Sequence, residues 1–365
     1  MNVAQNNVMS DAKLKQMQQI RWETKILKSY SALLKFAVNM DYKIYASLSG
    51  GLESVMINYL FDLLIKNTGI EFKKITVPNA ENVHNLKLCS KWGCEFTKVE
   101  RTKKEIMKKF YYPAPSKDVA MKIDRATRAL LNGNDRVVDI RTKGTVINGN
   151  HKTMSMIPYK WQYLMFAPFR VSEKCCEKIK KIPLNKATKK IGLAPVTGEM
   201  ASESKIRKEA YIKYGCNAYD KNTPKSTPLG FWTQQDVLAA IYNLGLEYSN
   251  AYGEIVYELG VYKTTGENRT GCDECTFGMT FDQDRFIRLK RNRPSIYNDI
   301  IGGGRFESTG NYRWVCYEPI NIIGKKYWEI LKHYKHELVW TDKIWVPDEN
   351  GYGMARVLDY LEYKY

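Results

Sequence analysis

The 365-residue sequence has no apolar run of the roughly 18 residues that a membrane-spanning helix needs. Its first residues, MNVAQNNVMSDAKLKQ, lack the apolar stretch of a secretory signal. Without an export signal the protein is expected in the cytoplasm, where thiols stay reduced, so its eight cysteines are not expected to form a disulfide framework. The absence of internal repeats and low-complexity linkers leaves ordinary globular domains, one large or two to three smaller.

Histidine is scarce, and acidic residues are outnumbered. The four histidines form no metal-ligand motif. The 57 Lys+Arg residues against 39 Asp+Glu give a net charge of +18, which raises the local concentration of polyanions. Nucleic acid is therefore a candidate partner and a nucleotide a smaller one. No nucleic-acid-binding module accompanies the charge, so a basic surface without such a partner is the alternative.

The first third of the chain predicts a strand, a glycine turn and a helix. The short apolar run KIYASLS (43–49) ends at Gly50-Gly51, and the helical segment VMINYLFDLLIKN (55–67) follows. A second strand is predicted in EFKKITVPN (71–79), which would complete a βαβ unit, and a further buried strand in KIGLAPVTG (190–198). This alternation predicts an α/β fold. Residues 10–39 before it are predicted to form one long amphipathic helix.

The glycine turn, SLSGGLES (47–54), is a candidate anion site. Backbone N–H groups in such a turn, together with the N-terminus of the following helix, bind phosphate or sulfate. The glycines permit close backbone approach, and serine hydroxyls add donors. A turn with a structural role alone is the alternative. The candidate contact residues here are Ser47, Ser49, Gly50, Gly51, Glu53 and Ser54.

Two cysteine pairs form the second candidate site. The first pair, Cys175-Cys176, lies in KCCEKIKKIPL, and the second, Cys272-x-x-Cys275, lies in RTGCDECTFG. Four thiolates in two tight pairs can hold a soft metal ion or an iron–sulfur cluster. Adjacent cysteines are awkward ligands for one small zinc ion and suit a larger cluster better. Zinc is the runner-up, and unligated buried cysteines or a vicinal disulfide are the remaining alternatives.

Several blocks of the sequence resemble one family. SGGLES resembles the Ser-Gly-Gly-x-Asp-Ser pyrophosphate loop of the adenine-nucleotide α-hydrolases. KCCEKIKKIPL, PVTGEMASESKIRKEAYIKYGCN, KSTPLGFWTQQDVLAAI and TGENRTGCDECTFG occur in the order found in the phosphoadenosine-phosphosulfate reductase family. The resemblance is nearest to its bacterial and phage reductase-like group and to the sulfur-transfer component of DNA phosphorothioation systems.

This resemblance implies a fold and a domain organisation. Residues 40–295 would form a Rossmann-like, doubly wound and mostly parallel α/β domain. A helical segment (1–39) would precede it, and an α+β extension (296–365) would follow.

The resemblance also implies site residues. Cys175, Cys176, Cys272 and Cys275 would hold a [4Fe–4S] cluster, as this arrangement does in adenylyl-sulfate reductases. An adenine nucleotide, either ATP or a sulfonucleotide, would bind the loop, with Mg²⁺ as a candidate companion. Beyond the loop, the candidate nucleotide contacts are Asn79, Glu203, Ser204 and Arg207. Glu53 and Arg207 are the candidate catalytic residues.

The sequence departs from the family pattern in three places. Leu52 stands where ATP-using members usually carry a lysine that would face phosphate, and Glu53 replaces aspartate, which puts ATP cleavage in doubt. VPNAE (77–81) lacks the glycine of the adenosine-binding turn. No Glu-Cys-Gly-x-His motif is present, so reduction of a sulfonucleotide is not the leading expectation.

Three functional hypotheses follow. The first is an enzyme that transfers sulfur or activates an acceptor with a nucleotide, acting on DNA or tRNA and supplied by a sulfur donor such as a cysteine desulfurase. The second is a sulfonucleotide reductase. The third is a non-catalytic, cluster-bearing binding or regulatory subunit whose loop is degenerate.

Overall fold

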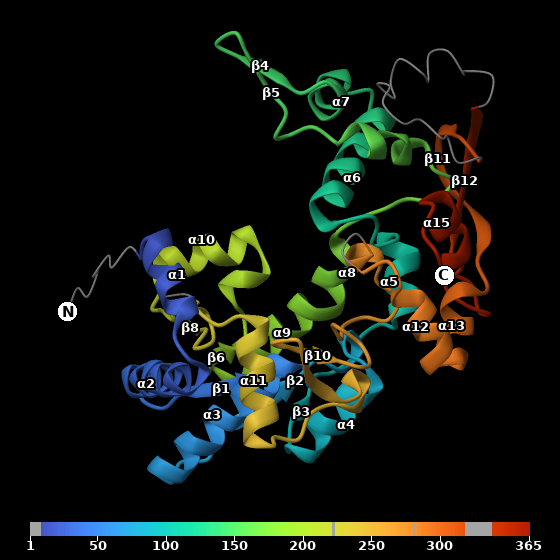
Figure 1. The fold of residues 1–365 in the computed structure, drawn as a ribbon. Coiled ribbons are helices and arrows are strands. Elements are labelled where there is room, and N and C mark those ends of the chain that lie inside the picture. Colours follow the sequence, from blue (N-terminus) through green and yellow to red (C-terminus); the bar gives the residue numbers. More distant parts are fainter. Residues whose placement is uncertain (1–8, 221–222, 280–281, 318–337) are drawn as a thin grey trace. The chain divides into compact units, whose positions relative to one another are not determined.

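The computed structural model describes residues 9–220, 223–279, 282–317 and 338–365. The chain forms two compact units, each built from two segments (Figure 1). Unit 1 comprises residues 1–99 and 182–271, and unit 2 comprises residues 100–181 and 272–365. The domain boundaries expected at 39/40 and 295/296 stay a prediction, because compact units and family domains are defined by different properties.

A six-stranded sheet forms the centre of unit 1. Its order is β3 (Glu95–Phe96), β2 (Lys73–Thr76), β1 (Ile44–Ser47), β6 (Ala194–Thr197), β8 (Lys225–Ser226) and β7 (Asn217–Ala218). Neighbouring strands are parallel except for β7 and β8. The predicted α/β class with a mostly parallel sheet is confirmed. From β1 the chain adds β2 and β3 on one side and returns to β6 on the other, so the strand order reverses between β1 and β6.

Helices and short turns surround this sheet in unit 1. They are α1 (Asp11–Gln19), α2 (Trp22–Asn39), α3 (Leu52–Thr68), η1 (Pro78–Ala80), α4 (Val83–Lys91), α9 (Ile182–Ile191), η4 (Ala201–Glu203), α10 (Lys205–Tyr214), α11 (Gln234–Leu244) and η5 (Asn250–Tyr252). A hairpin of β9 (Ile255–Glu258) and β10 (Val261–Thr264) completes the unit.

The prediction of one helix over residues 10–39 is wrong. Ile20 and Arg21 adopt extended backbone conformations and separate α1 from α2. Because the chain turns there, Leu14 of α1 and Ile26 of α2 both reach the same hydrophobic core. A pattern of apolar residues at helical spacing does not reveal a two-residue break of this kind.

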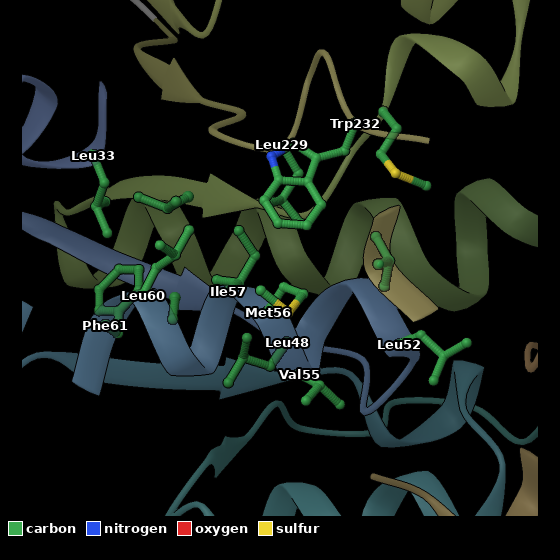
Figure 2. Close-up of a cluster of buried hydrophobic side chains, with 14 of the residues drawn as sticks. Leu33, Leu48, Leu52, Val55, Met56, Ile57, Leu60, Phe61, Leu229 and Trp232 are labelled. Carbon is green, nitrogen blue, oxygen red and sulfur yellow. The ribbon is translucent and has the colours of Figure 1, made fainter. Parts of the chain in front are cut away.

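The core of unit 1 fixes the strand and helix that flank the glycine turn. Ile44 and Ala46 of β1 belong to it, while the intervening Tyr45 points to the other face, where its hydroxyl lies 2.5 Å from that of Thr188 in α9. This alternation is the period of a strand buried on both faces. On the core side, Trp232 packs above α3 (Figure 2), and its indole N–H donates to Ser29 Oγ at 2.8 Å.

Unit 2 is mainly helical, with two separate hairpins. Its elements are α5 (Lys103–Phe110), α6 (Lys117–Leu131), α7 (Asp135–Thr142), β4 (Thr145–Ile147), β5 (Asn150–Lys152), η2 (Tyr159–Phe166), α8 (Lys174–Cys176), the π-helical turn η3 (Glu177–Lys181), η6 (Thr276–Gly278), α12 (Arg285–Asn292), α13 (Pro294–Ile301), β11 (Arg305–Val315), β12 (Val339–Val346) and α15 (Met354–Tyr360). β4 pairs with β5, and β11 pairs with β12, both antiparallel. Within the described parts of the chain, no helix is both long and apolar enough to cross a membrane.

Candidate functional site

The glycine turn lies in unit 1 where the strand order reverses, between the end of β1 and the start of α3. Open α/β sheets bind ligands at this position, beyond the carboxyl ends of the strands. Gly50 has φ +70°, and a Cβ there would stand 2.5 Å from the backbone oxygen of Asn85. Both the conformation and the close approach require glycine. Gly51, at φ −73°, caps the N-terminus of α3.

Two serines of the loop hold its shape. The N–H of Ser49 donates to Ser54 Oγ at 2.8 Å, and the two hydroxyl oxygens lie 3.1 Å apart. Ser54 is buried, so its hydroxyl acts mainly inside the turn. Ser49 is less buried than Ser54.

A hydrogen-bond network that the sequence did not reveal supports the loop from behind. Asn85 Nδ2 donates to the Ser49 carbonyl at 3.1 Å and to Thr270 Oγ1 at 2.8 Å. Thr270 Oγ1 lies 2.7 Å from the Tyr252 hydroxyl, which accepts the Leu52 N–H at 3.4 Å. The network therefore ties α4, η5 and the segment before the second cysteine pair to both ends of the turn.

Asn85 is fully buried, and its Oδ1 has no hydrogen-bond partner among the described residues. A buried amide oxygen without a hydrogen-bond donor costs free energy of folding. Asn85 Oδ1 is therefore a polar atom behind the loop whose hydrogen bonding the described residues do not satisfy. No pattern in the sequence singles out Asn85, Tyr252 or Thr270.

Leu52 is part of the hydrophobic core, with 2% of its surface exposed (Figure 2). The pyrophosphate loops that this turn resembles usually carry a lysine at this position, where it would face phosphate. A lysine side chain here would have to leave the core to reach an anion over the loop. The replacement by leucine therefore removes a cation and adds core packing to the first turn of α3.

Four charged residues gather beside the loop. Burial raises the pKa of Glu53, the nearby Glu203 raises it further, and Arg269 and Arg207 oppose the shift. Glu203 forms an ion pair with Arg207 and lies 3.4 Å from Arg269 Nη2. The structure thus brings the predicted residues Glu53, Glu203 and Arg207 together. It adds Arg269, which the sequence analysis had not assigned to this site.

Close packing between β6 and α3 sets the position of Glu53. A Cβ added to Gly198, just after β6, would stand 2.8 Å from the Cβ of Glu53. Glu203, in η4, is held by the N–H of Met200, which donates to its Oε2 at 2.8 Å. Glycine at 198 therefore lets the end of β6 pack closely against Glu53.

Three other predicted contacts have backbone or capping positions. Ser47 is the last residue of β1 and pairs with Ile75 and Thr197 of the neighbouring strands. Ser204 caps α10, and its hydroxyl accepts the Arg207 N–H at 3.3 Å. Asn79 lies in η1, directly after β2, and is half-buried. Their contacts with a nucleotide stay predictions.

The two cysteine pairs meet in unit 2. Cys175 and Cys176 lie in α8, and Cys272 and Cys275 lie in the turn that leads into η6. The Cys275 and Cys176 thiols hydrogen-bond to each other, and Cys272 interacts electrostatically with Cys175 and Cys275. None of the four forms a disulfide within the described part of the chain. Across the described ranges, no three His, Cys, Asp or Glu side chains are arranged to hold a metal ion, so metal binding stays a prediction.

The thiols of this cysteine site have different acidities. The hydrogen bond with Cys275 lowers the pKa of Cys176 to about 6 against the effect of burial, and Lys117 and Lys180 add to the lowering. The same hydrogen bond raises the pKa of Cys275, with burial adding to it, and burial raises that of Cys175. Cys176 is therefore readily available as a thiolate, the form that binds metal.

Basic side chains surround the second pair. Burial disfavours the charged form of Lys103, but Glu274 and Cys272 outweigh the effect of burial and raise the pKa of the lysine. Lys103 Nζ lies 2.9 Å from Glu274 Oε1. Arg285 Nη2 donates to the Cys272 carbonyl at 2.7 Å. Arg293 binds Asp273 through two hydrogen bonds of 2.7 and 2.9 Å. These contacts fix the C-x-x-C turn and place positive charge around it.

The fold and the loop define the class: an α/β protein with a glycine turn at the reversal point of a mostly parallel sheet. Residues 148–267 match the family described as phosphoadenosine phosphosulfate reductase domain. Over these residues the chain is similar to that family, which agrees with the predicted resemblance. The matched segment includes Cys175, Cys176, Glu203 and Arg207. It does not include the glycine turn or the second cysteine pair.

One solved structure is similar over much of the chain. It is the crystal structure of phosphoadenylyl-sulfate reductase from Candida auris in its phosphate complex, with 15% sequence identity and a TM-score of 0.33. The similarity covers 66% of this chain and 90% of that chain. No curated protein matches the sequence.

Proposed function

We propose that the protein binds an adenine nucleotide at the glycine turn and takes part in sulfur transfer or in nucleotide-activated modification of an acceptor. The observation that carries the proposal is the position of the turn. It lies where parallel strands reverse order, with helix N–H groups, serine hydroxyls and two arginines beside it. Arg207 and Arg269 would offset the charge of a phosphate or sulfonate, and Glu53 would be the proton-carrying group.

The four cysteines support an iron–sulfur cluster as the second part of the proposal. Four thiols that interact with one another, one of them with a lowered pKa, form a soft donor set, and nearby cations favour a negatively charged cluster. A cluster binds each thiolate at its own iron, so its ligands need not meet at one point as they do around zinc. When bound, the cluster would supply electron transfer or sulfur delivery.

The acceptor and the sulfur donor complete the proposal. The net charge of +18 supports a nucleic acid, DNA or tRNA, as the acceptor. A cysteine desulfurase is the class of protein that would supply the sulfur.

A non-cleaving binding protein is the second candidate, because Leu52 is buried in the core and no lysine extends from the loop. The two candidates differ in turnover. Each predicts binding of an adenine nucleotide, but only the enzyme predicts cleavage between the phosphates.

Nucleotide binding and turnover test this proposal together. Calorimetric titration with ATP, AMP and adenylyl sulfate measures binding, and ATP–pyrophosphate exchange measures cleavage. The double variant Ser49→Ala/Gly51→Ala should weaken binding at least tenfold, and the exposed Ser90→Ala on α4 serves as the control. Binding without exchange favours the non-cleaving candidate. If none of the three ligands binds, the nucleotide site is refuted.

Anaerobic purification tests the cluster. A brown protein that absorbs at about 400 nm and contains about four irons per chain supports the iron–sulfur cluster. Cys176→Ala should abolish the colour, while Cys216→Ala, a cysteine of unit 1, should keep it. Colourless protein with one zinc per chain would leave the nucleotide site standing and remove the cluster.

A further inference from the structure

We propose that Tyr252 is a ligand-contacting residue of the glycine turn, donating its phenolic hydrogen to the bound anionic group. This inference rests on the proposed nucleotide site and adds a contact that the sequence did not indicate. Tyr252 lies in η5, about 200 residues after the turn in sequence, and its side chain is buried against the turn.

Three side-chain oxygens lie close to the position that a Cβ of Gly51 would occupy. A Cβ at Gly51 would lie 3.3 Å from the Tyr252 hydroxyl, 3.4 Å from Glu53 Oε2 and 3.5 Å from Ser49 Oγ. These oxygens flank the side of Gly51 that carries no side chain, so a ligand atom in contact with its Cα would have hydroxyl groups on two sides. Gly51 is needed there for its lack of a side chain, since its φ of −73° is open to any residue.

The hydroxyl of Tyr252 is a neutral donor. Burial raises its pKa, with the nearby Glu53 adding to the shift, so the phenol keeps its proton at neutral pH. Its oxygen already accepts the Leu52 N–H, and the contact with Thr270 allows either hydroxyl to donate. The Tyr252 proton can therefore turn to a ligand while Thr270 donates in its place, with no heavy atom displaced.

Asn85 and Thr270 are positioning residues in this arrangement. The Asn85 amide donates to both the Ser49 carbonyl and Thr270 Oγ1, so it fixes the turn and the partner of Tyr252 together. A tyrosine placed by such a network has a defined hydroxyl position before any ligand arrives. Pre-arranged donors of this kind favour anion binding because little order is lost on association.

The test compares AMP with adenosine, which lacks the anionic group. Tyr252→Phe should weaken AMP binding about tenfold or more, the usual loss for a hydrogen bond to a charged group, and leave adenosine binding unchanged. Gly51→Ala should weaken AMP binding further, because its methyl group fills the same space. Tyr248→Phe is the matched control, since the Tyr248 hydroxyl accepts the Ile255 N–H at 3.0 Å within the same unit.

The outcomes separate the two proposals. Equal AMP affinity in wild type and Tyr252→Phe would overturn the role of Tyr252 while keeping the nucleotide site. An equal loss for AMP and adenosine would show that the phenylalanine disturbs the unit as a whole, and would also overturn it. A wild-type protein that binds neither ligand would refute the nucleotide site, and the inference with it.

Discussion

Glu53 is the residue of the glycine turn whose ionisation would affect a bound anion most. Its Oε2 lies 3.4 Å from the point that a Gly51 Cβ would occupy. The neutral carboxyl can donate a hydrogen bond to a ligand bound beside Gly51, whereas the carboxylate repels an anion. Burial and Glu203 raise its pKa, and Arg269 and Arg207 counteract them, so the neutral form persists to higher pH than usual.

This raised pKa predicts a pH-dependent affinity. Because the neutral form favours binding, AMP affinity should fall as pH rises through the raised pKa of Glu53. Glu53→Gln, which stays neutral, should bind AMP several-fold more tightly than wild type at about pH 8 and about equally at about pH 5. Titration calorimetry across this range measures it. The phosphate's own ionisation is common to both proteins, so the affinity ratio isolates Glu53, and a constant ratio would contradict the prediction.

At this scale the sequence predicted some site residues and missed others. Gly50, Glu53 and Arg207 belong to short motifs, and motifs are visible without a structure. Asn85 and Thr270 lie far apart in sequence and meet through a single hydrogen bond. Such contacts produce no periodic pattern and no fixed spacing in the sequence, so they become visible only in the folded structure.

At the level of elements, a buried ion pair joins α2 and α11, two helices that pack against each other and against α3. Lys25 of α2 is fully buried, and its Nζ lies 2.5 Å from Asp236 Oδ2 and 2.8 Å from the Gln18 carbonyl. The same carboxylate accepts the N–H and hydroxyl of Thr233 at 2.7 and 2.6 Å, which caps α11. Asp236 therefore stabilises one helix and neutralises a charge on another.

Removal of this carboxylate should destabilise the protein strongly. Asp236→Asn leaves the Lys25 charge buried without its partner, and breaking such pairs costs about 3–5 kcal/mol. Urea unfolding gives the free energy of unfolding directly. The double variant Lys25→Met/Asp236→Asn should recover much of the loss, because the buried charge is gone. A single variant as stable as wild type, or a double variant no better than the single, would contradict this account.

Element boundaries show where sequence patterns succeed. Thr233 and Asp236 have the three-residue spacing of a capping box, and they form one at the start of α11. The break between α1 and α2 was missed, because Ile20 and Arg21 carry no glycine or proline to signal it. Capping side chains act locally and are visible in sequence, whereas a break imposed by packing depends on distant residues.

For the whole molecule, the mostly parallel sheet was predictable and the division into two units was not. Strands and helices alternate locally, so β1, α3 and β2 could be recognised in order. Each unit, however, is assembled from two separate stretches of the chain. Which stretches associate is decided by packing between residues far apart in sequence.

The positive charge of the molecule is uneven along the chain. Residues 101–181 of unit 2 contain 19 Lys+Arg against 7 Asp+Glu, so this stretch carries 12 of the 18 net charges. Some of these cations are paired, such as Lys108 with Glu307 and Arg128 with Asp124. Arg136 and Lys152 are exposed on α7 and β5, and Lys160 is exposed beside Trp161, 5.2 Å from its ring.

These exposed cations predict a salt-dependent contact with nucleic acid. If all three contact phosphates, the variant Arg136→Gln/Lys152→Gln/Lys160→Gln should weaken DNA or tRNA binding and reduce the slope of log affinity against log salt by roughly two to three. Fluorescence anisotropy between about 50 and 200 mM salt measures this slope. The control neutralises three exposed lysines of unit 1, Lys28, Lys87 and Lys189, and should leave the slope nearly unchanged. Binding that is indifferent to salt, or equal effects of the two triple variants, would show that this stretch is not the contact surface.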